Sequence, residues 1–378
     1  MFETLSHIAL QQYWWILVSL LGSILVFLLF VQGGQTLTYQ LGKTDENRKL
    51  IINTIGSKWE FTFTTLVTFG GAFFASFPLF YSTSFGGAYW VWFAILIAFV
   101  IQAVAYEFRS KPNNFLGTKV FDGFLFVNGL LGTVLLGAAV STFFTGSNFT
   151  IDGEHHSHWT MASRGLEAAL NIQNLSLGLA VFFLSRVLAC LYFFNTISND
   201  EIIEKVKKQL WFNAVPFLVF FLLFTGLLMF KDGFAVNPTT GEVFMQPYKY
   251  FINLVEMPVV AILFLLGVVL VLLGIIRPIV SLTKYGDKAI WFAGLGTVLA
   301  VFSLFLLAGF NNTAYYPSVA DLQSSLTIAN SSSSHYTLTA MSYVSLFIPF
   351  VLVYIVYVWR AINNKKADIQ DLENEHVY

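Results

Sequence analysis

Two glutamates at the edges of apolar stretches are the first residues in this sequence whose chemistry needs an explanation. Glu60 directly precedes an uncharged run that continues to Tyr81, and Glu107 directly follows one that begins at Ala88. A carboxyl group can accept and release a proton, and ionisable residues at membrane depth are functional candidates. We therefore interpret Glu60 and Glu107 as candidates for a proton path. The alternative for Glu60 is an anion at a helix start, where the helix dipole favours negative charge.

Arg186 is the third ionisable candidate, because it lies inside the apolar segment 171–194. A charge at the centre of a membrane helix costs about 2.5–3.5 kcal/mol on insertion scales, so it needs an acidic partner or a hydrated cavity. We expect Arg186 to form an intramembrane ion pair, with Glu60 or Glu107, or to face another subunit. An ion pair that only fixes helix packing is an equally good interpretation.

The histidines limit the metals and haems that this chain could hold by itself. All six fall in predicted loops or termini, so no predicted helix supplies a histidine to a haem or metal site. Three of them form a short tract next to two acids, which we interpret as a solvated loop rather than a metal site. The tract is His155, His156 and His158, its acids are Asp152 and Glu154, and the other histidines are His7, His335 and His376.

Composition then defines the kind of chain that positions these residues. The chain has 378 residues, of which 56% are hydrophobic and 11% charged, against about 25% charged in an ordinary soluble domain. The net charge of −1 gives no basic field for nucleic acid. A single cysteine, Cys190, excludes an internal disulfide. We predict an all-α polytopic membrane protein whose residues 1–378 form a single transmembrane domain, with the first helix retained.

Apolar segments of bilayer length predict about nine transmembrane helices. Most of the 20 Lys and Arg residues fall in alternate connections, which places the N-terminus outside and the C-terminus in the cytoplasm. Glu60 and Glu107 then both lie near the cytoplasmic boundary. The predicted helices cover residues 14–31, 61–81, 88–106, 123–145, 171–194, 211–230, 257–276, 289–310 and 340–359.

Small residues on the second predicted helix indicate close helix packing. Gly71 and Ala75 are one turn apart, and Gly70 is adjacent to them. Such spacing lets the backbone of a neighbouring membrane helix approach closely. We therefore predict that Gly70, Gly71 and Ala75 face another helix.

Two blocks of sequence resemble one family of membrane enzymes. The first reads LG-basic-x-D-x-x-R from Leu41, then IIN-x-I, W-acid at Trp59 and GGA-x-FA-x-x-P ending at Pro78. The second covers Tyr316-Pro-Ser and the stretch from Ser325 to Ser333, which by itself is compatible with a polar connection. Together they resemble subunit II of the cytochrome bd family of quinol oxidases.

The resemblance implies a non-haem subunit that supports a haem-bearing subunit I and contributes to cytoplasmic proton uptake for the reduction of dioxygen to water. Haem b and haem d-type groups are then expected in the partner. A small single-helix accessory subunit, membrane lipid and a structural quinone are compatible further partners. The implied location is the bacterial plasma membrane.

One motif departs from the family pattern. Family members commonly carry Asp-Gly-x-Asp at the end of the first helix, where this chain reads Gln32-Gly33-Gly34-Gln35. Amides do not exchange protons near neutral pH, so a proton or cation role of that motif is not expected here. The acids of the next two helices are kept as Glu60 and Glu107.

A different class of protein remains open from the residues alone. An ion-coupled transporter or channel could use Glu60, Glu107 and Arg186 as its path, and an inverted repeat with broken helices would favour that interpretation. The sequence shows no such repeat. A purely structural scaffold, in contrast, would tolerate neutral residues at both acids.

Overall fold

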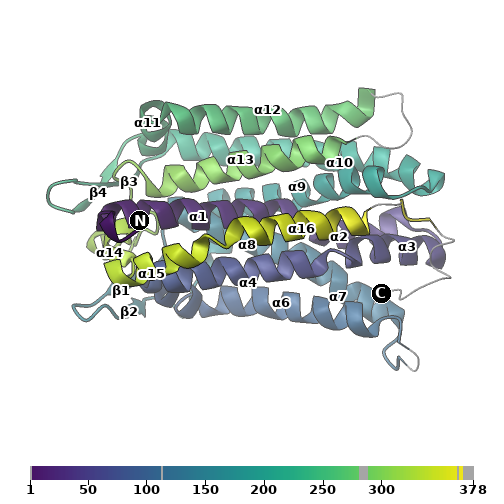
Figure 1. Ribbon diagram of the computed structural model, residues 1–378, viewed down its shortest axis with the longest axis horizontal. Helices are drawn as coiled ribbons and strands as arrows, with labels where there is room; N and C mark the ends of the chain where they lie inside the picture. Colours follow the sequence, from purple (N-terminus) through teal and green to yellow (C-terminus); the bar gives the residue numbers. More distant parts are fainter. Residues whose placement is uncertain (1, 112–113, 281–287, 364–365, 369–378) are drawn as a thin grey trace.

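The computed structural model describes residues 2–111, 114–280, 288–363 and 366–368. Its helices lie roughly parallel to one long axis, and two short β-hairpins gather at one end together with the N-terminal residues (Figure 1). We call this the hairpin end. We call the opposite end the Glu60 end, since the helix that begins with Trp59 and Glu60 starts there.

Eight helical runs of the described chain are long and apolar enough to cross a membrane, and a bent pair of helices brings the number to nine. The prediction of an all-α polytopic membrane protein is therefore confirmed. The first run, His7–Leu41, contains α1 (His7–Leu28) and α2 (Phe30–Leu41). Ser6 caps its start by accepting a hydrogen bond from the backbone N–H of Ala9.

The bent pair is the second predicted span. It consists of α3 (Asp45–Gly56), α4 (Trp59–Ser76), α5 (Pro78–Phe80) and the π-helix η2 (Tyr81–Gly86), with a bend of 118° after Ser76. Pro78 has no backbone N–H and suits the first position of a new helix. The span was predicted to cover residues 61–81, with Pro78 ending or kinking it near the far surface, and the chain turns away at Phe77.

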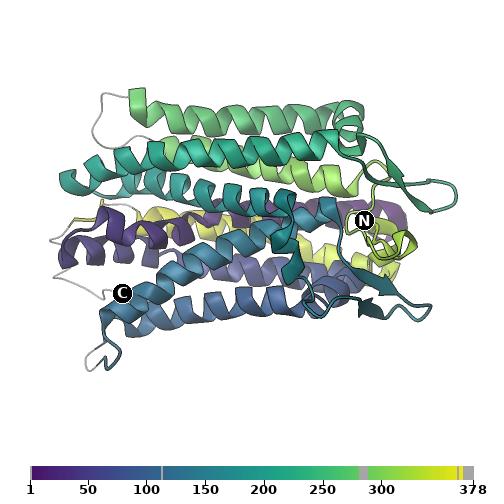
Figure 2. The ribbon, with the colours of Figure 1, turned by 180° about the vertical axis from the view of Figure 1, so that it is seen from behind.

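The next spans are α6 (Tyr89–Phe108), a run of three elements, and α9 (Ile172–Thr196). The run consists of α7 (Thr118–Val127), the π-helix η3 (Asn128–Gly132) and α8 (Thr133–Thr145), and Figure 2 shows it crossing the bundle obliquely. The α9 helix is the most buried span of the described chain and packs mainly on α2, α8 and α10.

The remaining helices complete the bundle. The α12 and α13 helices approach closely, because a Cβ atom at Gly267 would lie 2.6 Å from the backbone nitrogen of Ala300. The last run, formed by α15 and α16, is the least buried of all, with only 11% of its apolar window covered. The bounds are α10 (Asp200–Phe230), α11 (Lys249–Glu256), α12 (Pro258–Val280), α13 (Ala289–Gly309), α14 (Ile328–Ser331), α15 (His335–Ser345) and α16 (Ile348–Ile362).

Short elements at the hairpin end were not predicted. Two antiparallel hairpins form from β1 (Phe149–Ile151) with β2 (Ser157–Trp159), and from β3 (Gly233–Val236) with β4 (Val243–Gln246). Single 3-10 turns occupy η1 (Phe2–Thr4), η4 (Leu166–Leu170) and η5 (Leu322–Ser324).

The segment before the last span is packed into the hairpin end rather than forming a loose polar connection. The Tyr315 ring lies 4.4 Å from that of Trp15, and its hydroxyl is 2.7 Å from Ser331 Oγ. The backbone of Tyr316 pairs with that of Leu326. Burial raises the pKa of the Tyr316 phenol, so this residue stays neutral. The second block that carries the family resemblance thus closes the core at this end.

Candidate functional site

Glu60 lies in the first turn of α4 with its side chain exposed. Within the described residues its carboxylate forms no ion pair. Thr64 and Thr68 follow at one-turn intervals and are also exposed, and the Thr68 hydroxyl donates to the carbonyl of Thr64 at 2.7 Å. A carboxyl and two hydroxyls therefore form a polar stripe on a surface of α4 that the described chain does not cover.

Glu107 and Arg186 do not pair with one another or with Glu60. Glu107 Oε1 lies 3.1 Å from Lys111 Nζ, and both side chains are exposed. Arg186 is buried, and its Nη2 donates to Gln40 Oε1 at 2.5 Å. The reason is the packing of α9, which is held mainly by α2, α8 and α10 rather than by the helices that carry the two acids. The ion pair of Arg186 stays a prediction that would need an acid from outside the described chain.

The structure also brings together a set of polar side chains that sequence reasoning did not connect, and we call this set the polar seam. It joins α2, α6 and α7, and all its members are buried except Tyr39, which is exposed. On α2 and on α6 its members are spaced by three or four residues, so each set lies on one helix face. The polar seam comprises Gln32, Gln35 and Tyr39 of α2, Gln102, Tyr106 and Arg109 from the α6 face, and Asp122 of α7 with Asn128 of η3.

Two rungs of the polar seam are neutral hydrogen bonds between α2 and α6. Gln32 Nε2 donates to Gln102 Oε1 at 3.1 Å, and Gln35 Nε2 donates to the Tyr106 hydroxyl at 3.2 Å. The amides of Gln32 and Gln35 are therefore interhelical hydrogen-bond partners. In this chain they hold helices together and carry no exchangeable proton near neutral pH.

The third rung is charged and lies nearest the Glu60 end. Arg109 Nε donates to Asp122 Oδ1 at 2.6 Å, and the Tyr39 hydroxyl donates to Asp122 Oδ2 at 2.9 Å. The side chains of Arg109 and Asp122 are only 4% and 3% exposed. An arginine and an aspartate this deeply buried are stable together because each charge has a hydrogen-bonded partner.

Several buried atoms of the polar seam have no partner within the described chain. Leaving a polar group unsatisfied at membrane depth is costly, so we expect internal water molecules along the seam. Asn128, whose amide is entirely buried, sits in the π-turn η3 where the helix ladder is locally interrupted. The unpartnered atoms are Gln32 Oε1, Gln35 Oε1, Gln102 Nε2, Arg109 Nη1 and both amide atoms of Asn128.

Two of the three small residues of α4, Gly70 and Gly71, line a groove rather than a neighbouring helix. A Cβ atom at Gly71 would meet nothing within 4 Å, and one at Gly70 would lie 3.4 Å from the Phe85 ring. They line an apolar groove of about 570 Å³ between α4 and α6. Within the described chain no helix occupies this groove, so the neighbour predicted for Gly70, Gly71 and Ala75 stays a prediction.

The histidine tract lies on the β1–β2 hairpin. His158 Nε2 and His156 Nδ1 lie 3.1 Å and 3.5 Å from the carboxylate of Asp152, and all three side chains are largely exposed. Hydrogen bonds from the backbone N–H of His156 and the side chain of His158 hold the pKa of Asp152 well below its usual range. Across the described ranges, no group of three His, Cys, Asp or Glu side chains is arranged to hold a metal ion.

Sequence reasoning missed the polar seam for a specific reason. Arg109 was interpreted only as a basic residue that marks membrane orientation, and Asp122 lies directly before a predicted span. The signal that was present is the regular spacing of Gln102, Tyr106 and Arg109, which places three polar side chains on one face of an otherwise apolar helix.

The bundle, its interrupted second span and its polar seam together define a polytopic membrane protein. The family model for cytochrome bd terminal oxidase subunit II matches residues 10–362, and the chain belongs to this family. This confirms the resemblance stated from the sequence.

Individual relatives cover nearly the whole chain. It is 27% identical to cytochrome bd-I ubiquinol oxidase subunit 2 of Escherichia coli (strain K12), over 97% of this chain and 98% of that one. It is 27% identical to cytochrome bd ubiquinol oxidase subunit 2 of Bacillus subtilis (strain 168), over 93% and 96%. A chain in the structure of bd oxidase from Geobacillus thermodenitrificans shares the fold, with a TM-score of 0.60 at 12% identity over 94% of this chain and 98% of that one.

Proposed function

We propose that this chain is the non-haem subunit II of a cytochrome bd-type quinol:dioxygen oxidoreductase in a bacterial plasma membrane. The observation that carries the proposal is family membership over residues 10–362, with relatives named as ubiquinol oxidase subunits that match along their whole length. The reaction takes four electrons and four protons for each dioxygen reduced to two waters, with quinol as the electron donor.

The positions of the histidines in this chain support the assignment of haem to the partner, subunit I. Haem iron in this setting needs histidine or similar ligands between helices. The histidines in the described part of the chain lie at the hairpin end, where His7 contacts Ser333 and His335 contacts Leu5. These residues do not fit a haem between helices, so no step of the reaction is assigned to them.

The face formed by α4, α6 and α16 is the surface that we assign to subunit I. The α16 helix lies beside α4 (Figure 1), and the rings of Phe61 and Trp359 are 6.1 Å apart. Phe350 and Tyr357 of α16 are 73% and 71% exposed. The open groove at Gly71 adds a surface shaped to receive a helix or bulky side chains from a partner.

Glu60 is then placed to deliver protons from the cytoplasm to that partner. Its carboxyl and the hydroxyls of Thr64 and Thr68 run along the same uncovered face of α4. The carboxyl accepts a proton at the membrane boundary and passes it toward the oxygen-reducing site. Glu107, on the same end of α6, is proposed to collect protons at the surface.

The transporter alternative is less well supported by the geometry. It needs Glu60, Glu107 and Arg186 along one path. Glu60 is on an open surface, Glu107 pairs with Lys111, and Arg186 is buried against an amide on another side of the bundle.

The test uses the complete oxidase complex with Glu60→Gln, which keeps the size of the side chain but removes proton exchange. We expect normal assembly and haem spectrum but quinol-driven oxygen consumption slowed by about a hundredfold or more, the range that one proton-transfer residue contributes. Glu60→Asp should keep most of the activity. Glu46→Gln, an exposed acid on α3 at the same end, is the matched control.

Wild-type turnover by Glu60→Gln, with undiminished proton uptake from the cytoplasmic side, would show that Glu60 is only an anion at a helix start. A complex without haem, or no co-purifying haem subunit at all, would instead contradict the assignment of the chain to the oxidase.

A further inference from the structure

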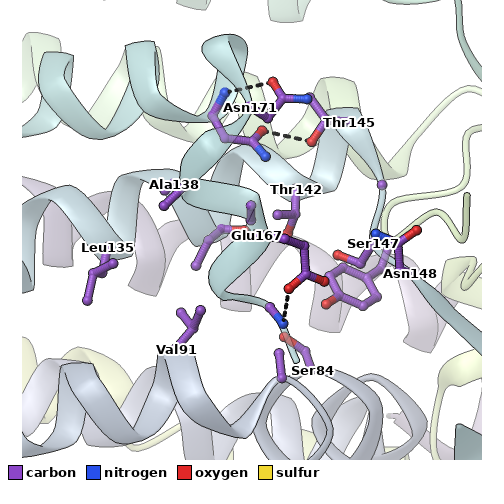
Figure 3. A pocket seen from close by; sticks show the side chains of 18 of the residues that line it. Ser84, Val91, Leu135, Ala138, Thr142, Thr145, Ser147, Asn148, Glu167 and Asn171 are labelled. Atoms are coloured by element: carbon purple, nitrogen blue, oxygen red, sulfur yellow. Dashed lines mark hydrogen bonds between the residues drawn. The ribbon is translucent and has the colours of Figure 1, made fainter. Parts of the chain in front are cut away.

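A polar pocket at the hairpin end lies far from Glu60 and from the polar seam. It has a volume of about 230 Å³ and is bounded by the start of α6, the end of α8, the η4 turn and the start of α9 (Figure 3). Glu167 projects into it between Thr142 and Ser84 (Figure 3). We infer that this pocket binds the headgroup of a zwitterionic phospholipid that carries a primary ammonium, with Glu167 and Arg164 as its two charged contacts.

The carboxylate of Glu167 is held in a fixed position. Its Oε2 accepts hydrogen bonds from Ser163 Oγ at 2.6 Å and from the backbone N–H of Gly165 at 2.9 Å. Its Oε1 receives no hydrogen bond from the described residues, and no Lys, Arg or His of the described chain lies within ion-pair distance. One oxygen of a half-buried anion is therefore free to bind a cation in the pocket.

The walls favour an organic cation over an anion or a metal ion. They combine hydroxyl, amide and aromatic side chains with aliphatic ones, and the lining contains no basic residue. Trp92 Nε1 donates to Ser84 Oγ at 3.3 Å, and Thr145 Oγ1 donates to Asn174 Oδ1 at 2.7 Å, so part of the wall is fixed by its own hydrogen bonds. A single carboxylate is too few ligands for Ca²⁺, which takes about six to eight oxygens. Aromatic faces and one carboxylate instead suit an ammonium group.

The start of α6, which contributes Val91 and Trp92 to the pocket lining, also carries two exposed aromatic side chains. Tyr89 and Trp90 begin α6 and are 38% and 42% exposed, as expected for aromatic side chains at the level of the lipid headgroups. The guanidinium of Arg164 sits 5.1 Å from the centre of the Tyr89 ring. Arg164 is exposed, and no carboxylate in the part of the chain that the structure describes pairs with it.

Arg164 and Glu167 are three residues apart and form no ion pair with each other, so a positive charge on the Tyr89 ring lies close along the chain to a negative charge in the pocket. A phosphate next to an ammonium has the complementary order of charges. The phosphate of the lipid would meet Arg164, whose planar guanidinium suits phosphate oxygens. The ammonium would enter the pocket and donate to Glu167 Oε1.

A primary ammonium fits this geometry better than a trimethylammonium. It has three N–H donors for the free carboxylate oxygen and the neighbouring hydroxyls, whereas a choline nitrogen has none. The structure therefore favours phosphatidylethanolamine over phosphatidylcholine, and over phosphatidylglycerol, which lacks a cation.

The test counts lipids bound to the intact, delipidated oxidase complex by native mass spectrometry, with titration of each of these three lipids. The wild-type complex should retain one phosphatidylethanolamine that phosphatidylcholine does not replace. Glu167→Gln keeps the size and the acceptor oxygen for Gly165, and it should weaken that one binding event by about tenfold or more, as for the loss of a charge-assisted hydrogen bond. Glu154→Gln, an acid 86% exposed on the β1–β2 hairpin, is the matched control.

Assembly and haem content of the Glu167→Gln complex should be unchanged, so that a binding loss is not caused by misfolding. Equal retention of phosphatidylethanolamine by wild type and Glu167→Gln would overturn the inference, as would equal binding of phosphatidylcholine. A parallel titration with free ethanolamine distinguishes a lipid headgroup from a soluble amine as the source of the ammonium. If ethanolamine alone binds as tightly as the lipid, the lipid assignment is wrong and the pocket takes a soluble amine.

Discussion

Removing the charge of Asp122 should destabilise the chain far more than removing that of Glu107, although both acids pair with a base near the same end. Asp122 is 3% exposed and accepts hydrogen bonds from both Arg109 and Tyr39. Glu107 is 60% exposed and pairs with Lys111 across one turn of α6. The substitution Asp122→Asn keeps the shape of the side chain and leaves the Arg109 guanidinium buried without an anion.

The magnitude follows from burial. Breaking a buried ion pair by removing one partner costs about 3–5 kcal/mol, because the remaining charge is left uncompensated in a medium of low polarity. The loss of a good acceptor for the Tyr39 hydroxyl acts in the same direction. An exposed pair separated by one helical turn contributes only about 0.3–0.5 kcal/mol. The two variants should therefore differ about tenfold in their loss of unfolding free energy.

The assay is reversible unfolding of the purified complex in mixed micelles of increasing denaturing-detergent content, followed by circular dichroism. Asp122→Asn and Glu107→Gln are compared at the same protein concentration, since a partner that binds the folded chain adds to its apparent stability. A loss below about 1 kcal/mol for Asp122→Asn would place the Arg109–Asp122 pair in a hydrated environment. It would refute the argument that the polar seam is held together by a buried charge pair.

Two further outcomes are expected. Gly267→Ala should lower the unfolding free energy, measured in a melting experiment, by about 1–3 kcal/mol, the usual cost of overpacking. The reason is that the new methyl would lie 2.6 Å from the backbone of Ala300. An unchanged melting temperature would mean that α12 and α13 are not in close contact. The β1–β2 hairpin should lose order in acid. Because the pKa of Asp152 is depressed, its carboxylate stabilises the hairpin above the ordinary carboxylate pKa of 3.8, and this stability is lost as the pH falls through the lowered pKa. Hydrogen exchange of the Glu154 and His156 amides, corrected for intrinsic rates, measures this loss. The Asp152→Asn variant should show no such dependence of exchange on pH.

The membrane spans could be predicted from the sequence because long uncharged segments have few alternatives in a bilayer. The bend after Ser76 could not be, since Pro78 is compatible with a kink within a span as well as with its end. The π-turn at Asn128 could not be predicted either, because it leaves the apolar pattern of the segment nearly unchanged. Local backbone irregularities depend on packing that a single segment does not reveal.

The candidate site was predictable in part for a related reason. Glu60 stands out because it is an acid beside an uncharged run, and the structure places it exposed on α4, while its role in proton transfer stays a prediction. The surroundings of Arg186 were not predictable, because its Gln40 partner comes from a helix far away in sequence. Pairing across the polar seam likewise depends on which helices are neighbours, whereas the spacing on each helix was visible beforehand.

The loose packing of α16 has a consequence for copies of the protein that lack a partner. Its one buried residue in the described structure is Trp359, whose ring lies 5.8 Å from that of Phe30 and 6.2 Å from that of Tyr192. Under the proposed assembly, a chain without subunit I would expose aromatic side chains of this helix such as Phe350 and Tyr357. Membrane proteases could then recognise unpartnered copies by these side chains, which would keep the amounts of the two subunits equal.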